Sequence, residues 1–321
     1  MLIRESVYRI LRHGGWLLLA SACVACGGED DENDPETGPF SVLEDVPDAL
    51  FLNAVWSFGP EDVWVAADSG RMLHYTGSWS EVTLPDGVTV VDLWSYAPGQ
   101  LIGIGGNHLV RFDGTEWTTE DLSGQGLGGS FYGGVWGAAD DDIWVVGDQS
   151  TAAHFDGATW TRYLAAGPDN TVVWGTPGGD VYTASVFQTG VFDGTDWQDV
   201  EDIDSGGEAI FGFGDDEVWV ADGSQLWNRE GSRWSLTEID GIGDITNMWG
   251  TGPSDLWGAG NFGAIYRYDG ASWEQLANQA TGSPFLRVFY DIHGSGQGDV
   301  WAIGGELGDA GNTPIIYRAD L

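Results

Sequence analysis

The chain has 321 residues, and its 50 Asp and Glu residues face 11 Arg residues and no Lys, which gives a formal net charge of −39. Such a surface repels phosphate backbones and anionic headgroups, because binding them needs a basic patch that releases counterions. We therefore expect no nucleic acid partner. With 51 Gly, 18 Trp and no uninterrupted helical apolar stripe, the composition favours an all-β fold with almost no helix after residue 40.

The first forty residues have the pattern of an export signal. Three Arg residues within positions 1–13 precede a short apolar run, residues 16–26, which is too short to span a bilayer. A basic stretch, a brief apolar run and small residues before a break are typical of a secretory signal peptide. Both cysteines of the chain, Cys23 and Cys26, lie at this break. The exported globular part therefore has no Cys, and no disulfide framework is expected.

Two glycines and an acidic stretch, residues 29–39, follow Cys26. This arrangement resembles the lipobox and tether of bacterial lipoproteins. The resemblance implies lipid attachment at Cys26, with Cys23 as the alternative, and stable anchoring, since each buried CH₂ contributes about 0.8 kcal/mol. Gly27 in place of Asp resembles outer-membrane sorting, with the periplasmic or cell-surface side left open. The implied segments are a signal peptide over 1–25, a disordered acidic tether over 26–39 and a folded domain over 40–321.

A phrase of about 40 residues recurs through that domain, and a period of this length predicts a solenoid, propeller or array. Its first element is an apolar segment that ends at Trp56, Trp94, Trp136, Trp174, Phe211, Trp249 and, more divergently, His293. Its second is an acidic turn with a short strand, at Asp62, Asp142, Asp180, Glu217, Asp255 and Asp299. Its third is a hairpin turn with Gly, followed by Trp79, Trp117, Trp160, Trp197, Trp234 and Trp273. With the strand after each Trp, every repeat has the four strands of a propeller blade.

The number of elements predicts how the ring closes. There are seven first elements but six Trp residues after a turn, so the last copy, residues 285–321, ends after its third strand. Residues 40–47 provide the missing strand, with Phe40 in the position of the Trp. We therefore expect a seven-bladed β-propeller of four-stranded blades, closed by an N-terminal strand that completes the last blade.

The repeats Asp-Val-Trp and Tyr-Asp-Gly-x-x-Trp resemble those of bacterial β-propellers that are often carried by lipoproteins, over residues 40–321. A weaker resemblance is to tectonin-like lectin propellers and to the Asp-box repeats of sialidase-like propellers, whose Asp-x-Gly-x-Thr-Trp spacing is one residue longer. These families specify a fold well and a ligand poorly, so function has to be argued from a site.

Few residues carry a signature of catalysis. His74, His108, His154 and His293 lie in different repeats, so we expect no metal site from them, and no catalytic residue is predicted. A sialidase-like site would need clustered Arg residues, whereas Arg111, Arg267 and Arg318 share one repeat position and should lie on separate blades. Acidic turns such as residues 140–142 and 215–217 have two interpretations: caps that keep the surface soluble, or a calcium site, which leaves calcium as the open cofactor. The overall charge likewise fits either solubility or salty surroundings.

Two function classes remain. The first is a monomeric, lipid-anchored, non-catalytic binding or scaffold module of the cell envelope, with a protein or glycan partner. The alternative is a glycoside hydrolase or lyase that acts on polysaccharide. Loops that vary between repeats, residues 118–129, 277–284 and 304–314, should share one face, where recognition usually lies. We predict partner contacts near Asp121, Phe131, Tyr132, Asn278, Glu306 and Asp309.

Overall fold

The computed structural model describes residues 39–43, 46–47, 51–128, 131–203, 205–223, 225–238, 245–278, 286–296, 298–308 and 311–319. The predicted signal peptide, Cys23, Cys26 and Asp309 lie outside these residues. The described residues belong to the compact unit Glu36–Leu321. The helices in the described ranges are three 3-10 turns, η1 (Asp68–Gly70), η2 (Pro85–Gly87) and η3 (Ser123–Gln125), and none of them could cross a membrane.

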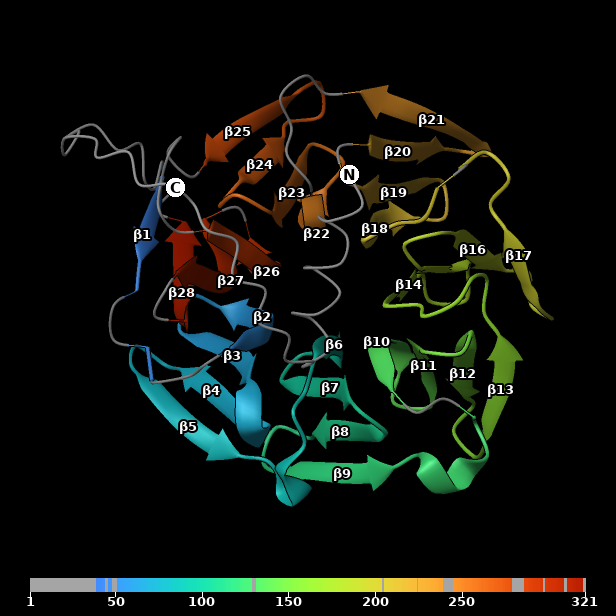
Figure 1. The fold of residues 1–321 in the computed structure, drawn as a ribbon, viewed down its shortest axis with the longest axis horizontal. Coiled ribbons are helices and arrows are strands. Elements are labelled where there is room, and N and C mark those ends of the chain that lie inside the picture. The colour runs from blue at the N-terminus through green and yellow to red at the C-terminus, as the bar shows by residue number, and fades with distance from the viewer. Residues whose placement is uncertain are drawn as a thin grey trace. The chain divides into compact units, whose positions relative to one another are not determined.

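The described strands form seven four-stranded antiparallel sheets arranged as a ring (Figure 1). Blades 1 to 4 are β2 (Leu52–Gly59), β3 (Asp62–Ala67), β4 (Arg71–Tyr75) and β5 (Trp79–Thr83); β6 (Asp92–Ala97), β7 (Gln100–Gly105), β8 (His108–Phe112) and β9 (Trp117–Asp121); β10 (Tyr132–Ala139), β11 (Asp142–Gly147), β12 (Thr151–Phe155) and β13 (Trp160–Leu164); and β14 (Val172–Gly175), β15 (Val181–Ala184), β16 (Thr189–Phe192) and β17 (Trp197–Asp199). Blades 5 to 7 are β18 (Ala209–Gly214), β19 (Glu217–Asp222), β20 (Gln225–Glu230) and β21 (Arg233–Glu238); β22 (Ile245–Gly252), β23 (Asp255–Gly260), β24 (Ile265–Tyr268) and β25 (Trp273–Ala277); and β26 (Leu286–Gly296), β27 (Asp299–Gly308), β28 (Gly311–Ala319) and β1 (Phe40–Val42). The predicted seven-bladed β-propeller is confirmed.

The N-terminal strand closes the ring as predicted. β1 is the outer strand of blade 7 and pairs antiparallel with β28, with Phe40 opposite Ala319. The strand ends at Val42, earlier than the eight-residue segment suggested, and one more bond joins Leu43 N to Ile316 O at 3.0 Å. The two ends of the domain therefore share one sheet, and β1 covers the edge that β28 would otherwise expose.

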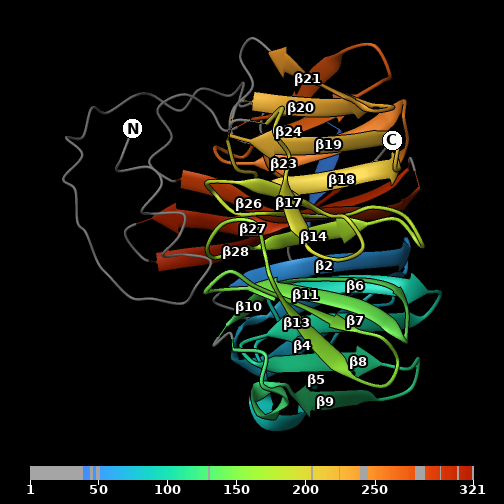
Figure 2. The same ribbon diagram turned by 90° about the vertical axis from the view of Figure 1, so that its right-hand side faces the viewer.

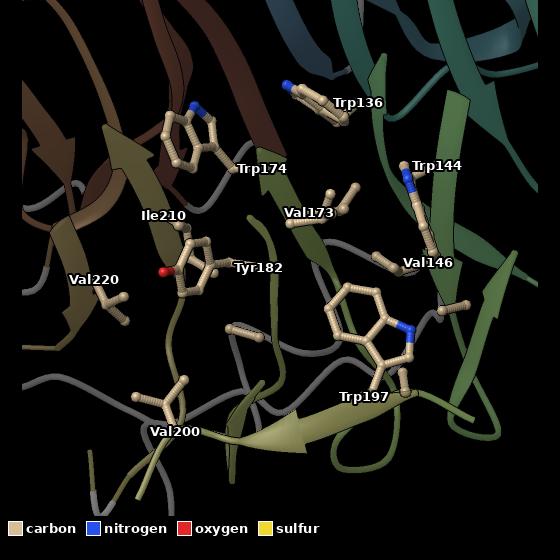
Figure 3. Close-up of a cluster of buried hydrophobic side chains, with 14 of the residues drawn as sticks. Trp136, Trp144, Val146, Val173, Trp174, Tyr182, Trp197, Val200, Ile210 and Val220 are labelled. Atoms are coloured by element: carbon tan, nitrogen blue, oxygen red, sulfur yellow. The ribbon is translucent and has the colours of Figure 1, made fainter. Parts of the chain in front are cut away.

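Aromatic side chains hold neighbouring blades together, which is the physical reason for the repeat. In six of the seven junctions, the first aromatic residue of the outer strand meets, nearly edge-on, the aromatic residue of the second strand in the preceding blade. The pairs are Trp79–Trp301, Trp117–Trp64, Trp197–Trp144, Trp234–Tyr182, Trp273–Trp219 and Phe40–Trp257, with ring centroids 5.5 to 6.4 Å apart. Figure 3 shows the cluster around blade 4, with Trp144 and Trp197 on one side of it and Tyr182 on the other. Phe40 therefore takes the place of a Trp in blade 7.

A second ring of aromatic residues surrounds the axis, one on each innermost strand. Each of these residues is followed by Gly or Ser, which leaves room for the indole of the preceding blade. A Cβ added to Gly212 would come within 2.7 Å of the Trp174 ring, and one added to Gly294 within 2.7 Å of Trp249. Trp94 also donates its indole N–H to Gly137 O at 2.8 Å. The aromatic-Gly/Ser pair is thus a packing requirement.

The topology creates two faces with different contents. Turns between the first and second strands and between the third and fourth strands lie on one face, which we call the regular face. Turns between the second and third strands, together with the links between blades, lie on the opposite face, which we call the variable face. The three inner strands of blade 7 are longer than the strands of the other blades, with 11, 10 and 9 residues in β26, β27 and β28, and they extend furthest on the variable face (Figure 2).

Candidate binding surface

Several carboxylates on the regular face have hydrogen-bond partners within the fold. In four of the hairpin turns an Asp side chain accepts hydrogen bonds from the backbone N–H groups two and three residues ahead, at 2.8 to 3.0 Å; these residues are Asp113, Asp156, Asp193 and Asp269. The backbone hydrogen bonds hold the pKa of each of these carboxyl groups below its ordinary value. Glu230 replaces Asp in blade 5. The turn there is shorter, and Glu230 of β20 lies opposite Arg233 of β21 in the strand register.

A second group of carboxylates pairs with His and Arg side chains on third strands. Three pairs lie within one blade, His74–Asp62 at 2.8 Å, His154–Asp142 at 2.7 Å and Arg267–Asp255 at 2.9 Å, whereas Arg229–Asp180 at 2.7 Å joins blade 5 to blade 4. Each of these bases also lies over the aromatic ring two residues after its carboxylate partner, as His74 does on Trp64 with 3.9 Å between ring centroids. His74, His154 and Arg267 therefore brace individual blades, and Arg229 braces a junction between two blades.

The Arg residues that a sialidase-like site would gather are dispersed. Arg111 lies over Phe155 of the next blade, Arg267 over Trp257 and Arg318 over Trp301, on blades 2, 6 and 7. The expectation that they occupy separate blades is confirmed. Across the residues that the structure describes, no three His, Cys, Asp or Glu side chains are grouped so that they could hold a metal ion. Of the acidic turns considered for calcium, Asp142 is paired with His154, and Asp215 accepts hydrogen bonds from Thr176 and from Asp180 N.

His293 replaces the axial Trp in blade 7 and has a structural role. Its ring lies against Trp56, with 3.9 Å between centroids, and its Nδ1 accepts the Ser57 N–H at 3.1 Å. The residue as a whole is half-buried, but the ring is enclosed by Trp56 and Trp249. Burial of the ring lowers the pKa of His293 to about 3, so the imidazole is neutral at physiological pH and serves as an acceptor.

Exposed apolar side chains collect on the variable face. Across the described ranges six large apolar side chains are exposed: Val42, Leu164, Val186, Phe187, Leu236 and Phe262. Four of the six lie on the variable face, with Leu164 at the end of β13, Val186 and Phe187 in the turn after β15, and Phe262 in the turn after β23. Exposed apolar residues gathered on one face are typical of an interaction surface.

The structure places the predicted contact residues on this face, but in two separate groups. Asp121, Phe131 and Tyr132 lie at the link from blade 2 to blade 3, whereas Asn278 and Glu306 lie on blades 6 and 7. Tyr132 is 1% exposed and packs between blades 2 and 3, so its side chain belongs to the core. Phe131 is half-buried and donates its N–H to the Asp148 carboxylate at 3.2 Å.

The remaining predicted residues have polar partners or remain exposed. Asp121 is exposed, and its carboxylate accepts the Ser123 N–H at 2.8 Å, which lowers the pKa of Asp121. Glu306 forms an ion pair with Arg287, which bonds it through Nε at 2.9 Å. Asn278 is exposed. Whether any of these residues contacts a partner stays a prediction.

Sequence reasoning missed a turn on this face that exposes two large apolar side chains. Val186 and Phe187 form the tip between β15 and β16, and Phe187 is 62% exposed. The equivalent turns of other blades contain Asp68-Ser69-Gly70, Gly106-Asn107 and Asp148-Gln149-Ser150, which are ordinary turn residues. Two large apolar residues at a position where the repeat predicts a turn were a readable signal, because no neighbouring strand can cover them.

The sevenfold ring of four-stranded blades defines the chain as a seven-bladed β-propeller, and solved structures share this fold. YCF48 bound to a D1 peptide is 14% identical, with a TM-score of 0.66 over 90% of this chain and 100% of that one. The WD40 repeats of RRP9 are 9% identical, with a TM-score of 0.66 over 89% and 99%. The extracellular domain of the hybrid two-component system BT4673 from B. thetaiotaomicron is 11% identical, with a TM-score of 0.66 over 88% of this chain but 39% of that one. No family model and no curated protein matches the sequence.

Proposed function

We propose that the protein is a lipid-anchored, non-catalytic binding module of the cell envelope that recognises a protein partner with its variable face. The observation that carries this proposal is the distribution of side chains between the two faces. Several regular-face carboxylates cap turns or pair with bases, whereas four of the six large apolar side chains that are exposed in the described ranges lie on the variable face. A rigid ring that presents apolar residues on irregular loops fits recognition of a partner.

Similar propellers support the choice of a protein partner. The similar structures include YCF48 in complex with a D1 peptide and a chain of the Mitotic Checkpoint Complex. Sequence identity to these chains is 14%, so they support a scaffold that suits protein contacts and say nothing of the ligand of this chain.

The proposed anchor rests on the Cys26-Gly-Gly sequence and the acidic stretch after it. Replacing Cys26 with Ser should abolish labelling by a fatty-acid analogue and release the protein in soluble form. Cys23→Ser is the matched control and should keep both labelling and membrane association. If labelling survives Cys26→Ser and disappears with Cys23→Ser, the lipid is attached at Cys23. If labelling persists in both variants, the proposed lipid anchor at these cysteines is wrong.

The proposed face is tested by exchanging loops. Residues 118–129, 277–284 and 304–314 are replaced by short Gly-containing turns, and capture of envelope proteins is compared with that of the unmodified chain. We expect intact folding and loss of capture. A control chain carries Asp113→Asn and Asp193→Asn on the regular face and should capture normally. Loss of capture in the control alone would place the binding surface on the regular face. If material is still captured after the extract has been treated with protease, the partner is a glycan.

A further inference from the structure

The tip of the β15–β16 hairpin is built from residues that turns rarely use. Ser185 N donates to Gln188 O at 2.9 Å, and Val186 and Phe187 stand between them. Neither residue has a positive φ, whereas Gln149 and Ser150 at the equivalent tip of blade 3 have φ of 56° and 53°. The side chains of Val186 and Phe187 offer the turn no hydrogen bonds and leave apolar surface in water, with exposures of 45% and 62%. A choice of residues that conflicts with local preference is typical of a functional position.

Two glycines clamp this tip from both sides. A Cβ at Gly206, in the link from blade 4 to blade 5, would come within 1.9 Å of Ser185 O and 2.5 Å of Phe187 N. A Cβ at Gly167, in the link from blade 3 to blade 4, would come within 2.6 Å of Ser185 Oγ. Gly207 N also donates to Ser185 O at 2.9 Å. The backbone of the tip is therefore fixed in place while its two apolar side chains point away from the core, and such a preorganised anchor loses little entropy on binding.

Charge in the segment of the chain that carries the tip has a single sign. Residues 163–228 contain thirteen Asp and Glu residues and no Arg, Lys or His. The link that contains Gly167 also contains Asp169, and the link that contains Gly206 contains Glu201 and Asp202, both exposed. Carboxylates thus stand in both of the links that flank the apolar pair. This arrangement complements a ligand with an apolar centre and positive charges on either side.

We propose that the Val186–Phe187 tip docks an extended cationic peptide segment of a protein partner, in which a large apolar side chain is flanked by Lys or Arg. This assignment rests on the proposed function and specifies the chemistry of the partner. The apolar side chain of the peptide contacts Phe187, and its basic side chains face Asp169 on one side and Glu201 and Asp202 on the other. An anionic membrane surface is disfavoured because the carboxylates repel it, and a second copy of the chain is disfavoured because it presents the same negative face.

The test uses the purified full chain and a fluorescein-labelled peptide with a central Phe, two Arg residues on each side and a Gly/Ser background. Fluorescence anisotropy gives its Kd at low salt. Phe187→Ser should weaken binding at least tenfold, and Glu201→Gln combined with Asp202→Asn should weaken it several-fold and reduce its salt dependence. Leu236→Ser is the matched control, since Leu236 is an exposed apolar residue on the outer strand β21, 37% exposed, and should change the Kd less than twofold.

A second peptide separates specific docking from general attraction to an acidic protein. Its central Phe is replaced by Ser while its four Arg residues are kept. Equal affinity for the two peptides, or no effect of Phe187→Ser on the first, would overturn the proposal. If the loop exchange abolishes partner capture but Phe187→Ser leaves both capture and peptide binding unchanged, the tip assignment is wrong and the binding module stands. Capture that survives both changes would contradict the proposed function itself.

Discussion

Phe40 is the residue on which closure of the ring depends. Its side chain is 4% exposed, packs edge-on against Trp257 at 6.2 Å and contacts Tyr317 at 6.1 Å. Phe40→Ala removes a ring of the size that buries roughly 150–250 Å², and at about 25 cal/mol per Å² the loss is about 4 kcal/mol after allowing for the Ala that remains. Measured Phe→Ala costs in protein cores, about 3–5 kcal/mol, agree with this magnitude.

Urea unfolding followed by Trp fluorescence measures the effect. Val42→Ala is the matched control, because Val42 lies in the same strand but is 43% exposed, and it should cost less than about 1 kcal/mol. Phe40→Ala should lower Tm by about 10 °C, since 1 kcal/mol corresponds to roughly 2–4 °C in a domain of this size class. If the two variants have the same stability, or if residues 40–47 can be deleted without loss of stability, β1 does not hold the ring closed.

Three further predictions follow from packing and charge. Gly206→Ala should destabilise the protein strongly because its Cβ would overlap Ser185 O, whereas Gly59→Ala, whose Cβ meets nothing within 4 Å, should be nearly neutral; equal Tm values would refute the clamp. The pKa of His293 is about 3 in the fold against an ordinary value of 6.5, so the unfolded chain takes up the proton first and stability falls as pH drops from 6.5 towards 3. His293→Phe should therefore remove about 2 kcal/mol of the stability lost between pH 6.5 and 5 in urea titrations, and an unchanged pH profile would contradict this. With a net charge of −39, Tm should rise as NaCl is raised from low to molar concentration, and a flat response would contradict strong self-repulsion.

Much of the fold could be predicted because the same packing problem is solved seven times. Each blade needs an aromatic residue to meet its neighbour, so Trp recurs at a fixed position and marks the strands. Even the replacement of Trp by Phe40 was predictable, since the spacing from Phe40 to Trp56 is within one residue of that from Trp79 to Trp94. The inferred roles of the Asp-Gly turns and of the dispersed Arg residues followed from the same regularity.

The binding surface was harder to predict because it lies where the repeat breaks down. The length of the segments between repeats drew attention to residues 118–129 and 304–314. The structure corrects the expectation of a loop for the second segment, because residues 304–308 and 311–314 extend the paired strands β27 and β28. Length also does not determine exposure, since Tyr132, next to the first segment, is buried. The Val186–Phe187 tip is short and regular in length, so only its composition distinguishes it. Its rigidity depends on contacts with Gly167 and Gly206, which lie in different links and meet the tip only in the folded ring.

The assignment of binding to the variable face is tested most directly by site-specific photo-crosslinking in cells. A photoreactive amino acid is placed at Phe187 on the variable face or at Thr195, which is exposed in a regular-face turn. We expect a crosslinked partner from position 187 and none from position 195, with the attached segment rich in Lys, Arg and apolar residues. Crosslinks from position 195 alone would contradict the assignment of the partner to the variable face.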